Sequence, residues 1–334
     1  MNLTEEHQET PCVHSNFSCL QTSPTATEML LYMSVAVVVS LTVCGNLLVI
    51  ISICHFKQLQ TPTNFLVLSL AMADFLVGVI VMPLYFTMWI DPWRCFDILY
   101  CTTFKVAAYY FTCISIYNVA LITLDRYLAL SNPFHYSMKM TVNVTLRMIA
   151  ILWLYSLIYS MVLLYFNGDI TDMKADITCG ECSVTVNKVW AIVDFIIAFV
   201  LPCSMIVIIN LKIFAIAKKH ANKIRSVRKC PKNDHGSMAS ERKAAKSLGI
   251  LVAVFLLCLV PYYVSAFVDI YFRNKSVHLA ISITAPLVYL NSSINPIIYA
   301  LFYPWFQRSV KLILTLRICG KESSILNVLE RETL

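Results

Sequence analysis

The sequence predicts an all-α membrane protein, a seven-transmembrane helix bundle with a short amphipathic helix after the last span. The 334 residues are 58% hydrophobic and only 13% charged, whereas soluble globular domains carry about 25% charged residues. Apolar stretches long enough to cross roughly 30 Å of hydrocarbon also recur along the chain. The predicted spans lie near 30–54, 64–88, 101–130, 147–166, 189–217, 244–270 and 280–303.

Basic residues indicate the orientation of the bundle. Residues 1–28 contain no Lys or Arg, whereas 218–246 are rich in both. Because Lys and Arg favour the cytoplasmic side in short loops, we expect a multi-pass plasma-membrane protein with its N-terminus extracellular and its C-terminus cytoplasmic. The first 28 residues lack the apolar core of a signal peptide, so the first span should direct insertion. The predicted divisions are an extracellular N-terminus (1–29), a seven-transmembrane domain (30–304), and an amphipathic helix with a cytoplasmic tail (305–334).

The net charge of +7 comes mostly from the basic cluster in 218–246. A positive patch beside a membrane suits anionic lipids and a cytosolic partner, so nucleic acid is not an expected partner.

Cysteines divide by side once this topology is assumed. Six fall outside the cell, where up to three disulfides can form, and spacing alone allows fifteen pairings of six cysteines. Metal binding is the alternative for such a group of cysteines, and we expect no metal site. Asn2 and Asn16 begin Asn-x-Ser/Thr sequences and are predicted glycosylation sites. The outer cysteines are Cys12, Cys19, Cys95, Cys101, Cys179 and Cys182.

Polar residues inside the spans are the first functional candidates. Asn291, Asn295 and the helix-breaking Pro296 occur in an otherwise apolar last span, where unpaired polar groups are costly unless they line a hydrated interior. Asp74, near the middle of the second span, could form one polar cluster with them. The alternative is a purely structural network, in which these buried polar groups are hydrogen-bonded to one another and have no role in function. The complete predicted cluster is Asn46, Asp74, Ser115, Asn291 and Asn295.

Several motifs resemble those of rhodopsin-like G-protein-coupled receptors. Asn295-Pro-Ile-Ile-Tyr299 matches the Asn-Pro-x-x-Tyr motif of their last helix, and Asp125-Arg126-Tyr127 ends the third span. Trp153, Pro202 and Pro261 extend the match over nearly the whole chain. The string from Asn291 to Phe306 resembles one branch, the trace amine-associated receptors. The resemblance implies a receptor, not an enzyme, that binds a small molecule and activates a heterotrimeric G protein. The expected G protein is of the stimulatory or olfactory type and raises cyclic AMP.

The resemblance also implies roles for individual residues. It pairs Cys101 with Cys182 and suggests Cys12–Cys179 and Cys19–Cys95. By the same resemblance, the polar cluster is expected to hold water and a structural sodium ion. No other cofactor is expected. Asp125 can neutralise Arg126 locally, and Glu241 can hold Arg126 in a latch that breaks on activation; charged helix ends solvated by headgroups are the alternative. The implied switch residues are Asp125, Arg126, Tyr127, Glu241, Asn295, Pro296 and Tyr299.

Two positions depart from the family pattern. The sixth span reads Cys258-Leu259-Val260-Pro261 where the family usually has Cys-Trp-x-Pro, and Asn210 stands where a tyrosine is common. We expect the switch to work, with altered basal activity or trigger.

The expected ligand anchor is also displaced. Amine receptors of this family carry an aspartate eighteen residues before the motif arginine, and here that position is Ala108. Asp194 instead lies in an apolar stretch of the fifth span, where a carboxylate needs a cation or a proton. This resembles a group of fish trace amine-associated receptors used in olfaction. The ammonium would bind Asp194, enclosed by Tyr109, Tyr262, Tyr263 and Tyr289.

Other interpretations remain open from the sequence. Asp194 could pair internally with Lys105 or Lys188, and the tyrosines could be ordinary packing. Lys105 could instead anchor an acidic or neutral ligand. A transporter is a remote alternative because no internal repeats occur. After the last span, apolar and basic residues interleave from Gln307 to Cys319, which predicts an amphipathic helix on the membrane and a palmitoylation site at Cys319.

Overall fold

The structure is a computed structural model. It describes residues 25–91, 96, 98–166, 182, 187–227, 235–272, 274–320, 324 and 328–329, with the backbone alone described at 98, 220–227, 235–248 and 319. Asn2, Asn16, Cys12, Cys19, Cys95 and Cys179 lie outside these residues.

The predicted fold class is confirmed: within the described residues, seven helical segments are long and apolar enough to cross a membrane. Two of them contain a π-helical turn, η2 in the second span and η3 in the fifth. The spans are α1 (Ala26–His55), α2 (Pro62–Leu76) with η2 (Val77–Val81) and α3 (Met82–Ile90), α4 (Ile98–Ser131), α6 (Val142–Phe166), α7 (Lys188–Asp194) with η3 (Phe195–Val200) and α8 (Leu201–Val227), α9 (His235–Asp269), and α10 (Lys275–Phe302).

Shorter helices lie between or after the spans. They are η1 (Lys57–Leu59), α5 (Pro133–Lys139), α11 (Pro304–Leu314) and η4 (Arg317–Cys319).

Polar caps explain why some helices begin earlier than their apolar stretches. Thr25 and Glu28 form a capping box that starts α1 four residues before the predicted position 30, and the side chain of Asn274 accepts a hydrogen bond from the Val277 amide at 2.9 Å. Such caps satisfy backbone N–H groups that have no partner within the helix. Hydropathy misses these turns because the capping residues are polar.

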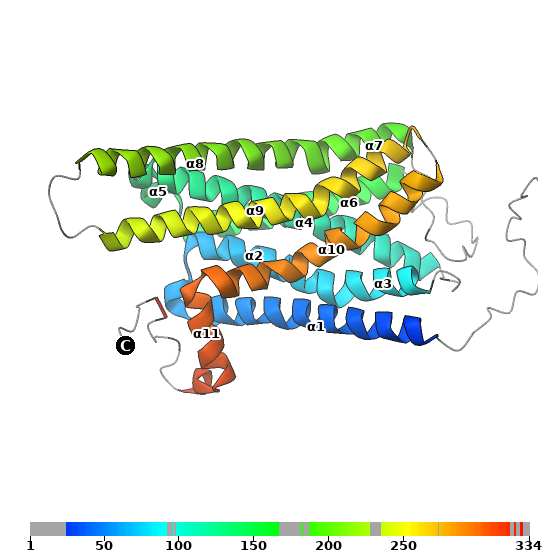
Figure 1. The fold of residues 1–334 in the computed structure, drawn as a ribbon, viewed down its shortest axis with the longest axis horizontal. Helices are drawn as coiled ribbons and strands as arrows, with labels where there is room; N and C mark the ends of the chain where they lie inside the picture. Colours follow the sequence, from blue (N-terminus) through cyan, green and yellow to red (C-terminus); the bar gives the residue numbers. More distant parts are fainter. Residues whose placement is uncertain are drawn as a thin grey trace, which may run out of the picture.

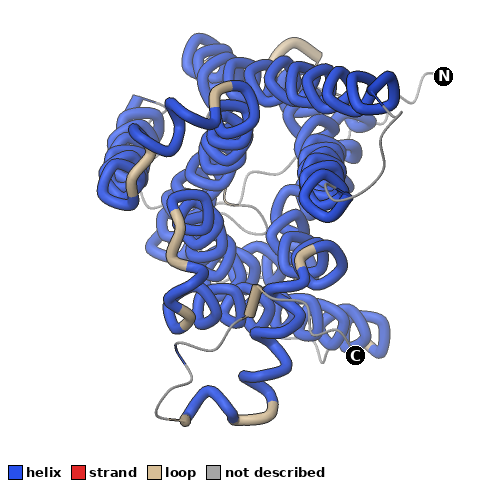
Figure 2. Tube along the Cα trace, turned by 90° about the vertical axis from the view of Figure 1, so that its left-hand side faces the viewer, coloured by secondary structure: helices blue, strands red, loops and turns tan. Residues whose placement is uncertain are grey.

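The long helices run side by side, and α11 crosses their direction next to α1 (Figure 1). The end-on view shows the long helices packed around one another as a bundle (Figure 2), and the second and third spans are the most buried of the seven. α4 contacts α2, α6 and α8, and α9 packs along α10. We call the end that carries α11 the α11 end and the opposite end the disulfide end.

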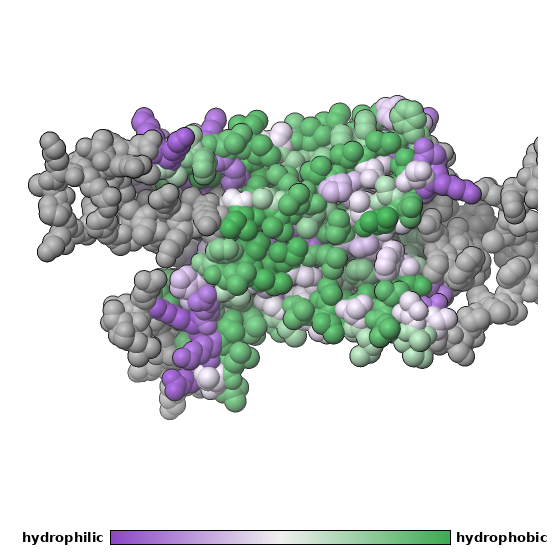
Figure 3. Space-filling model, in the orientation of Figure 1, coloured by the Kyte–Doolittle hydropathy of each residue, from purple (hydrophilic) through white to green (hydrophobic). Residues whose placement is uncertain are grey.

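The surface matches a bilayer. Hydrophobic residues cover the middle of the bundle, and hydrophilic ones gather toward its ends and on α11 (Figure 3). On α11 the hydrophobic residues face the middle of the bundle and the hydrophilic residues face away, which is the pattern of a helix lying in a membrane interface.

α1 and α10 approach very closely at Gly45. A Cβ atom added there would lie 2.8 Å from the Cβ of Pro296. One turn away, the Thr42 and Ser293 hydroxyls are hydrogen-bonded at 2.6 Å. Small residues allow backbones to approach inside a membrane, so Gly45 fixes the position of α10 against α1.

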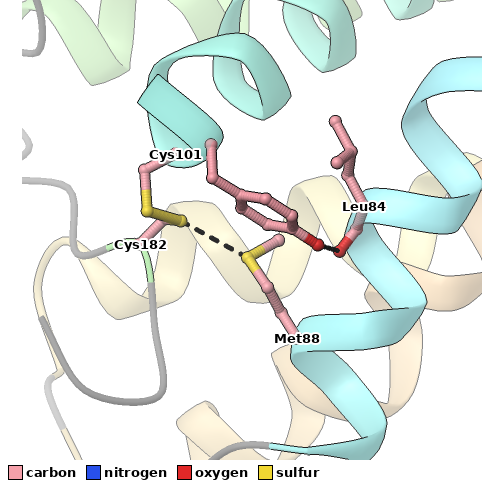
Figure 4. Close-up of a disulfide and its surroundings, with 5 residues drawn as sticks. Leu84, Met88, Cys101 and Cys182 are labelled. Carbon is pink, nitrogen blue, oxygen red and sulfur yellow. Dashed lines mark hydrogen bonds between the residues drawn. A yellow bond between two sulfur atoms is a disulfide. The ribbon is translucent and has the colours of Figure 1, made fainter. Parts of the chain in front are cut away.

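A disulfide joins Cys101, in the first turn of α4, to Cys182, with a Cα–Cα distance of 5.3 Å. The Cys182 sulfur lies 3.3 Å from the sulfur of Met88 in α3 (Figure 4). Beside it, the Tyr100 hydroxyl donates to the Leu84 carbonyl at 2.8 Å. The disulfide therefore links Cys182 to the region where α3 ends and α4 begins, although Cys182 lies 81 residues after Cys101 in the chain.

We expect Gly45→Ala to destabilise the bundle by about 1–3 kcal/mol, since the added methyl overpacks the α1–α10 contact. Thermal unfolding of the purified protein in detergent measures this as a lower Tm. Gly249→Ala is the matched control, because nothing lies within 4 Å of a Cβ added at that position. Equal Tm values for the two variants would contradict the packing argument.

Cys182→Ser should strongly reduce the amount of protein at the cell surface, because loss of a native disulfide typically costs about 2–5 kcal/mol. Surface labelling of an N-terminal epitope measures it. Cys44→Ser is the control, since Cys44 is an exposed free cysteine on α1. Normal surface levels of Cys182→Ser would show that this disulfide is not needed for the structure.

Candidate functional site

Asp74 is the centre of a buried polar cluster. Its side chain is fully buried, and its carboxylate accepts hydrogen bonds from Ser115 at 3.3 Å, Ser292 at 2.8 Å and Asn295 at 2.7 Å. The donors come from α4 and α10, so three helices meet at one carboxylate. Ser115 and Asn295 are two of the residues that the sequence suggested for this cluster.

Asn46 and Asn291 are the other two residues that the sequence suggested for this cluster. Asn46 donates to the carbonyls of Thr42 and Ser292, so it joins the cluster through the backbone of α10. Asn291 is 4% exposed and lines the cavity described next. The sequence analysis missed Ser292 as a partner of Asp74. Its spacing of three from Asn295, which places both on one helical face, was the available signal.

A small cavity adjoins the cluster. About 10 Å³ of it is open to the centre of a water molecule, roughly the space that one water needs. Ser115, Asn291 and Ser292 form its polar side, and Phe255 and Leu259 lie on its apolar side. Leu259, the residue that replaces the family tryptophan, is therefore a wall of the space next to Asp74.

Asp194 ends α7 immediately before the π-helical turn η3. Its side chain is half-buried and accepts a hydrogen bond from the Tyr159 hydroxyl at 2.9 Å. The Tyr159 ring stacks on Tyr155 with a centroid distance of 6.0 Å. The sequence analysis missed Tyr159. The i, i+4 spacing of Tyr155 and Tyr159 puts both on one face of α6, but nothing in that pattern identifies α7 as the neighbour.

The predicted aromatic residues fall into two groups. Near Asp194, Tyr263 of α9 stacks on Phe199 of η3 at 4.4 Å and contacts Tyr262 edge-on at 5.5 Å. Farther along, Tyr289 of α10 packs against Tyr85 of α3 at 4.7 Å.

Two residues named from the sequence lie on α4, toward the disulfide end of that helix. Tyr109 is half-buried on α4. Ala108 is 8% exposed and belongs to an apolar cluster with Phe86 and Phe111. No carboxylate occupies the Ala108 position, so α4 offers no acidic anchor at that point.

The motif at the α11 end is held by hydroxyl groups. The Asp125 carboxylate accepts hydrogen bonds from Thr63 and Tyr136, both at 2.7 Å. Burial, with a smaller contribution from Asp125, raises the pKa of Tyr136 to about 12, so this hydroxyl stays protonated and can donate. These donors come from α2 and α5, and the neutralisation of Arg126 by Asp125 stays a prediction. The Glu241 side chain lies outside the described residues.

Other switch residues pack along α10 and α4. Tyr299 is 2% exposed and contacts Tyr303 at 5.6 Å and Phe306 at 6.3 Å. The Lys212 ammonium lies 6.0 Å from the centre of the Tyr127 ring. Pro296 is buried against Gly45, as described above.

Among the described residues, no group of three or more His, Cys, Asp or Glu side chains is arranged to hold a metal ion.

Comparisons with known proteins agree with this arrangement. Residues 45–299 match the family model described as 7 transmembrane receptor (rhodopsin family). The chain is 38% identical over 323 residues to trace amine-associated receptor 13c of Danio rerio, with 94% of each chain covered. It is 37% identical to trace amine-associated receptor 7c of Rattus norvegicus and 7f of Mus musculus, with 98% of this chain and 92% of each relative covered.

This family consists of receptors and not of enzymes. With its seven spans, buried Asp74 cluster and end-to-end similarity to these relatives, the chain belongs to the rhodopsin family of seven-transmembrane receptors and, within it, to the trace amine-associated receptors.

Proposed function

We propose that this chain is an olfactory amine receptor of the plasma membrane that binds the ligand ammonium through Asp194. The disulfide end faces outside, and the α11 end activates a stimulatory or olfactory G protein that raises cyclic AMP. The observation that carries the proposal is the half-buried Asp194 carboxylate, whose hydrogen-bond donor is the neutral Tyr159 hydroxyl.

A carboxylate in an apolar helix is unfavourable unless a cation or a proton compensates it. The Tyr159 hydroxyl supplies one hydrogen bond but no charge. An alkylammonium supplies both a positive charge and three donors. An amine ligand is therefore the simplest complement to Asp194. The relatives of this chain are also named for trace amines.

Aromatic rings around Asp194 would enclose the rest of the ligand. Tyr263 and Phe199 stack beside η3, and Tyr262 contacts Tyr263 edge-on. Each suitably placed ring adds about 0.5–2 kcal/mol to cation binding. Tyr109 and Tyr289 would contact the ligand on the α4 and α10 sides.

The Asp74 cluster would stabilise the resting state by holding water and a sodium ion. Asp74, Ser115 and Ser292 offer oxygen atoms, the ligands that hard cations prefer, and Asn46 Oδ1 is buried without a hydrogen-bond partner. A cation there would supply positive charge beside Asp74. The Leu259 side chain fills less of the adjoining cavity than a tryptophan would, and the remaining space favours hydration.

The switch at the α11 end would then break on activation. With Asp125 engaged by Thr63 and Tyr136, Glu241 on α9 is the proposed acceptor for Arg126, and outward movement of α9 would separate them. Palmitoylation of Cys319, in η4 after the amphipathic α11, would hold this helix at the membrane.

We expect Asp194→Asn to lower amine potency at least about tenfold, because it keeps the shape of the side chain and removes the charge. Truncating one partner of a desolvated charge pair typically costs about 2–5 kcal/mol. The measurement is a panel of mono- and polyamines on cells expressing the chain, read by cyclic AMP. Surface expression is measured in parallel so that loss of protein is distinguished from loss of binding.

Lys105→Ala is the discriminating variant for the rival ligand class. Retained amine potency in Asp194→Asn would exclude Asp194 as the ammonium anchor. A response of the parent chain to acidic or neutral ligands that Lys105→Ala abolishes would favour the rival ligand class.

Ala108→Asp should extend recognition toward diamines. It adds a second carboxylate on α4, at the position where the family's usual aspartate stands, so both ends of a diamine can be neutralised. The expected result is at least about tenfold higher potency for a diamine than in the parent chain, with little change for the matching monoamine. Ala108→Asn, which has the same shape without the charge, is the control, and an equal gain in both variants would exclude the electrostatic explanation.

A further inference from the structure

We infer that the α11 end carries a docking site for the chain's own C-terminal tail, filled by Val328. Val328 lies beyond α11 in the sequence, yet it is only 1% exposed. It forms an apolar cluster with Phe56 and Leu59, which are both fully buried, and Trp305 and Leu312 pack against the same cluster. We call these four residues the tail pocket: Phe56, Leu59, Trp305 and Leu312.

A polar contact accompanies the apolar one. The Arg308 guanidinium donates a hydrogen bond from Nη1 to the Val328 carbonyl at 3.3 Å. The next residue, Leu329, is 59% exposed. The site therefore selects one branched apolar side chain and the carbonyl of the same residue, rather than burying the tail non-specifically.

The two walls of the tail pocket come from different parts of the bundle. Phe56 and Leu59 follow α1, whereas Trp305 and Leu312 belong to α11. Docking Val328 between them holds α11 against the end of α1. α11 lies beside α1, on the side of the bundle opposite α8 (Figure 1), so the docked residue is kept near α1.

A chain of aromatic contacts connects the tail pocket to α10. Tyr299 contacts Phe306 at 6.3 Å, and Phe306 contacts Trp305 at 5.7 Å. Trp305 is itself a wall of the tail pocket. Displacement of Tyr299 would therefore move Trp305, so the docking of Val328 depends on the position of α10. This coupling goes beyond ligand recognition and requires no ligand for its test.

Thiol labelling of the full chain in inside-out vesicles tests the docking. Val328→Cys should react with a maleimide about tenfold more slowly than Leu329→Cys, because burying an aliphatic side chain shifts such an equilibrium by about tenfold or more. Mass spectrometry of the labelled peptide identifies the site despite the native cysteines. Equal rates at the two positions would overturn the docking site.

A second measurement avoids changing the tail. Arg308→Met removes the donor to Val328 and should speed hydrogen exchange of the Val328–Leu329 backbone about tenfold. Lys311→Met is the matched control, since it removes the same charge from an exposed position on α11. Equal exchange in Arg308→Met and Lys311→Met would contradict the polar part of the site.

The coupling has its own variant. Tyr299→Leu should increase labelling of Val328→Cys about threefold or more while leaving Leu329→Cys unchanged, since it removes the ring that contacts Phe306. An unchanged rate at Val328→Cys would show that the tail pocket does not sense α10.

Discussion

The cost of an unpaired polar group in hydrocarbon is the constraint on which the rest of this structure depends. Within the bilayer, water cannot complete a hydrogen bond. Asp74 therefore draws donors from α4 and α10 onto one carboxylate, and Asn46 reaches the backbone of α10 for the same reason. These bonds fix how α1, α2, α4 and α10 lie against each other. The close approach at Gly45 is possible only within that arrangement.

The same constraint separates the two ends of the molecule into different chemical environments. Near the disulfide end, Asp194 has one neutral donor, Tyr159, and is surrounded by aromatic rings. Near the α11 end, Asp125 has two hydroxyl donors. The Asp74 cluster lies between these two acids. The bundle therefore places two carboxylates with different sets of hydrogen-bond donors at opposite ends of the same helices.

Much of this architecture could be predicted from the sequence, since hydropathy alone locates the spans and polar residues inside them stand out. The helix starts at Ala26 and Lys275 were missed because caps are polar. Ser292 and Tyr159 were missed for a different reason. Each is one polar residue among several on its helix, and only the rotation and tilt of neighbouring helices decide which of them meets a given acid. Val328 could not be anticipated at all, because its contacts join segments far apart in the chain.

The π-helical turn η3 has a consequence for the direction in which Asp194 points. A π-turn is, in effect, a stored insertion of one residue. One residue corresponds to about 100° of rotation in an α-helix. Converting η3 (Phe195–Val200) to regular α-helix would turn Asp194 by roughly that angle relative to α8 without replacing any pocket residue. A single-residue deletion there would redirect the carboxylate, so this span can alter its chemistry by changing register rather than composition.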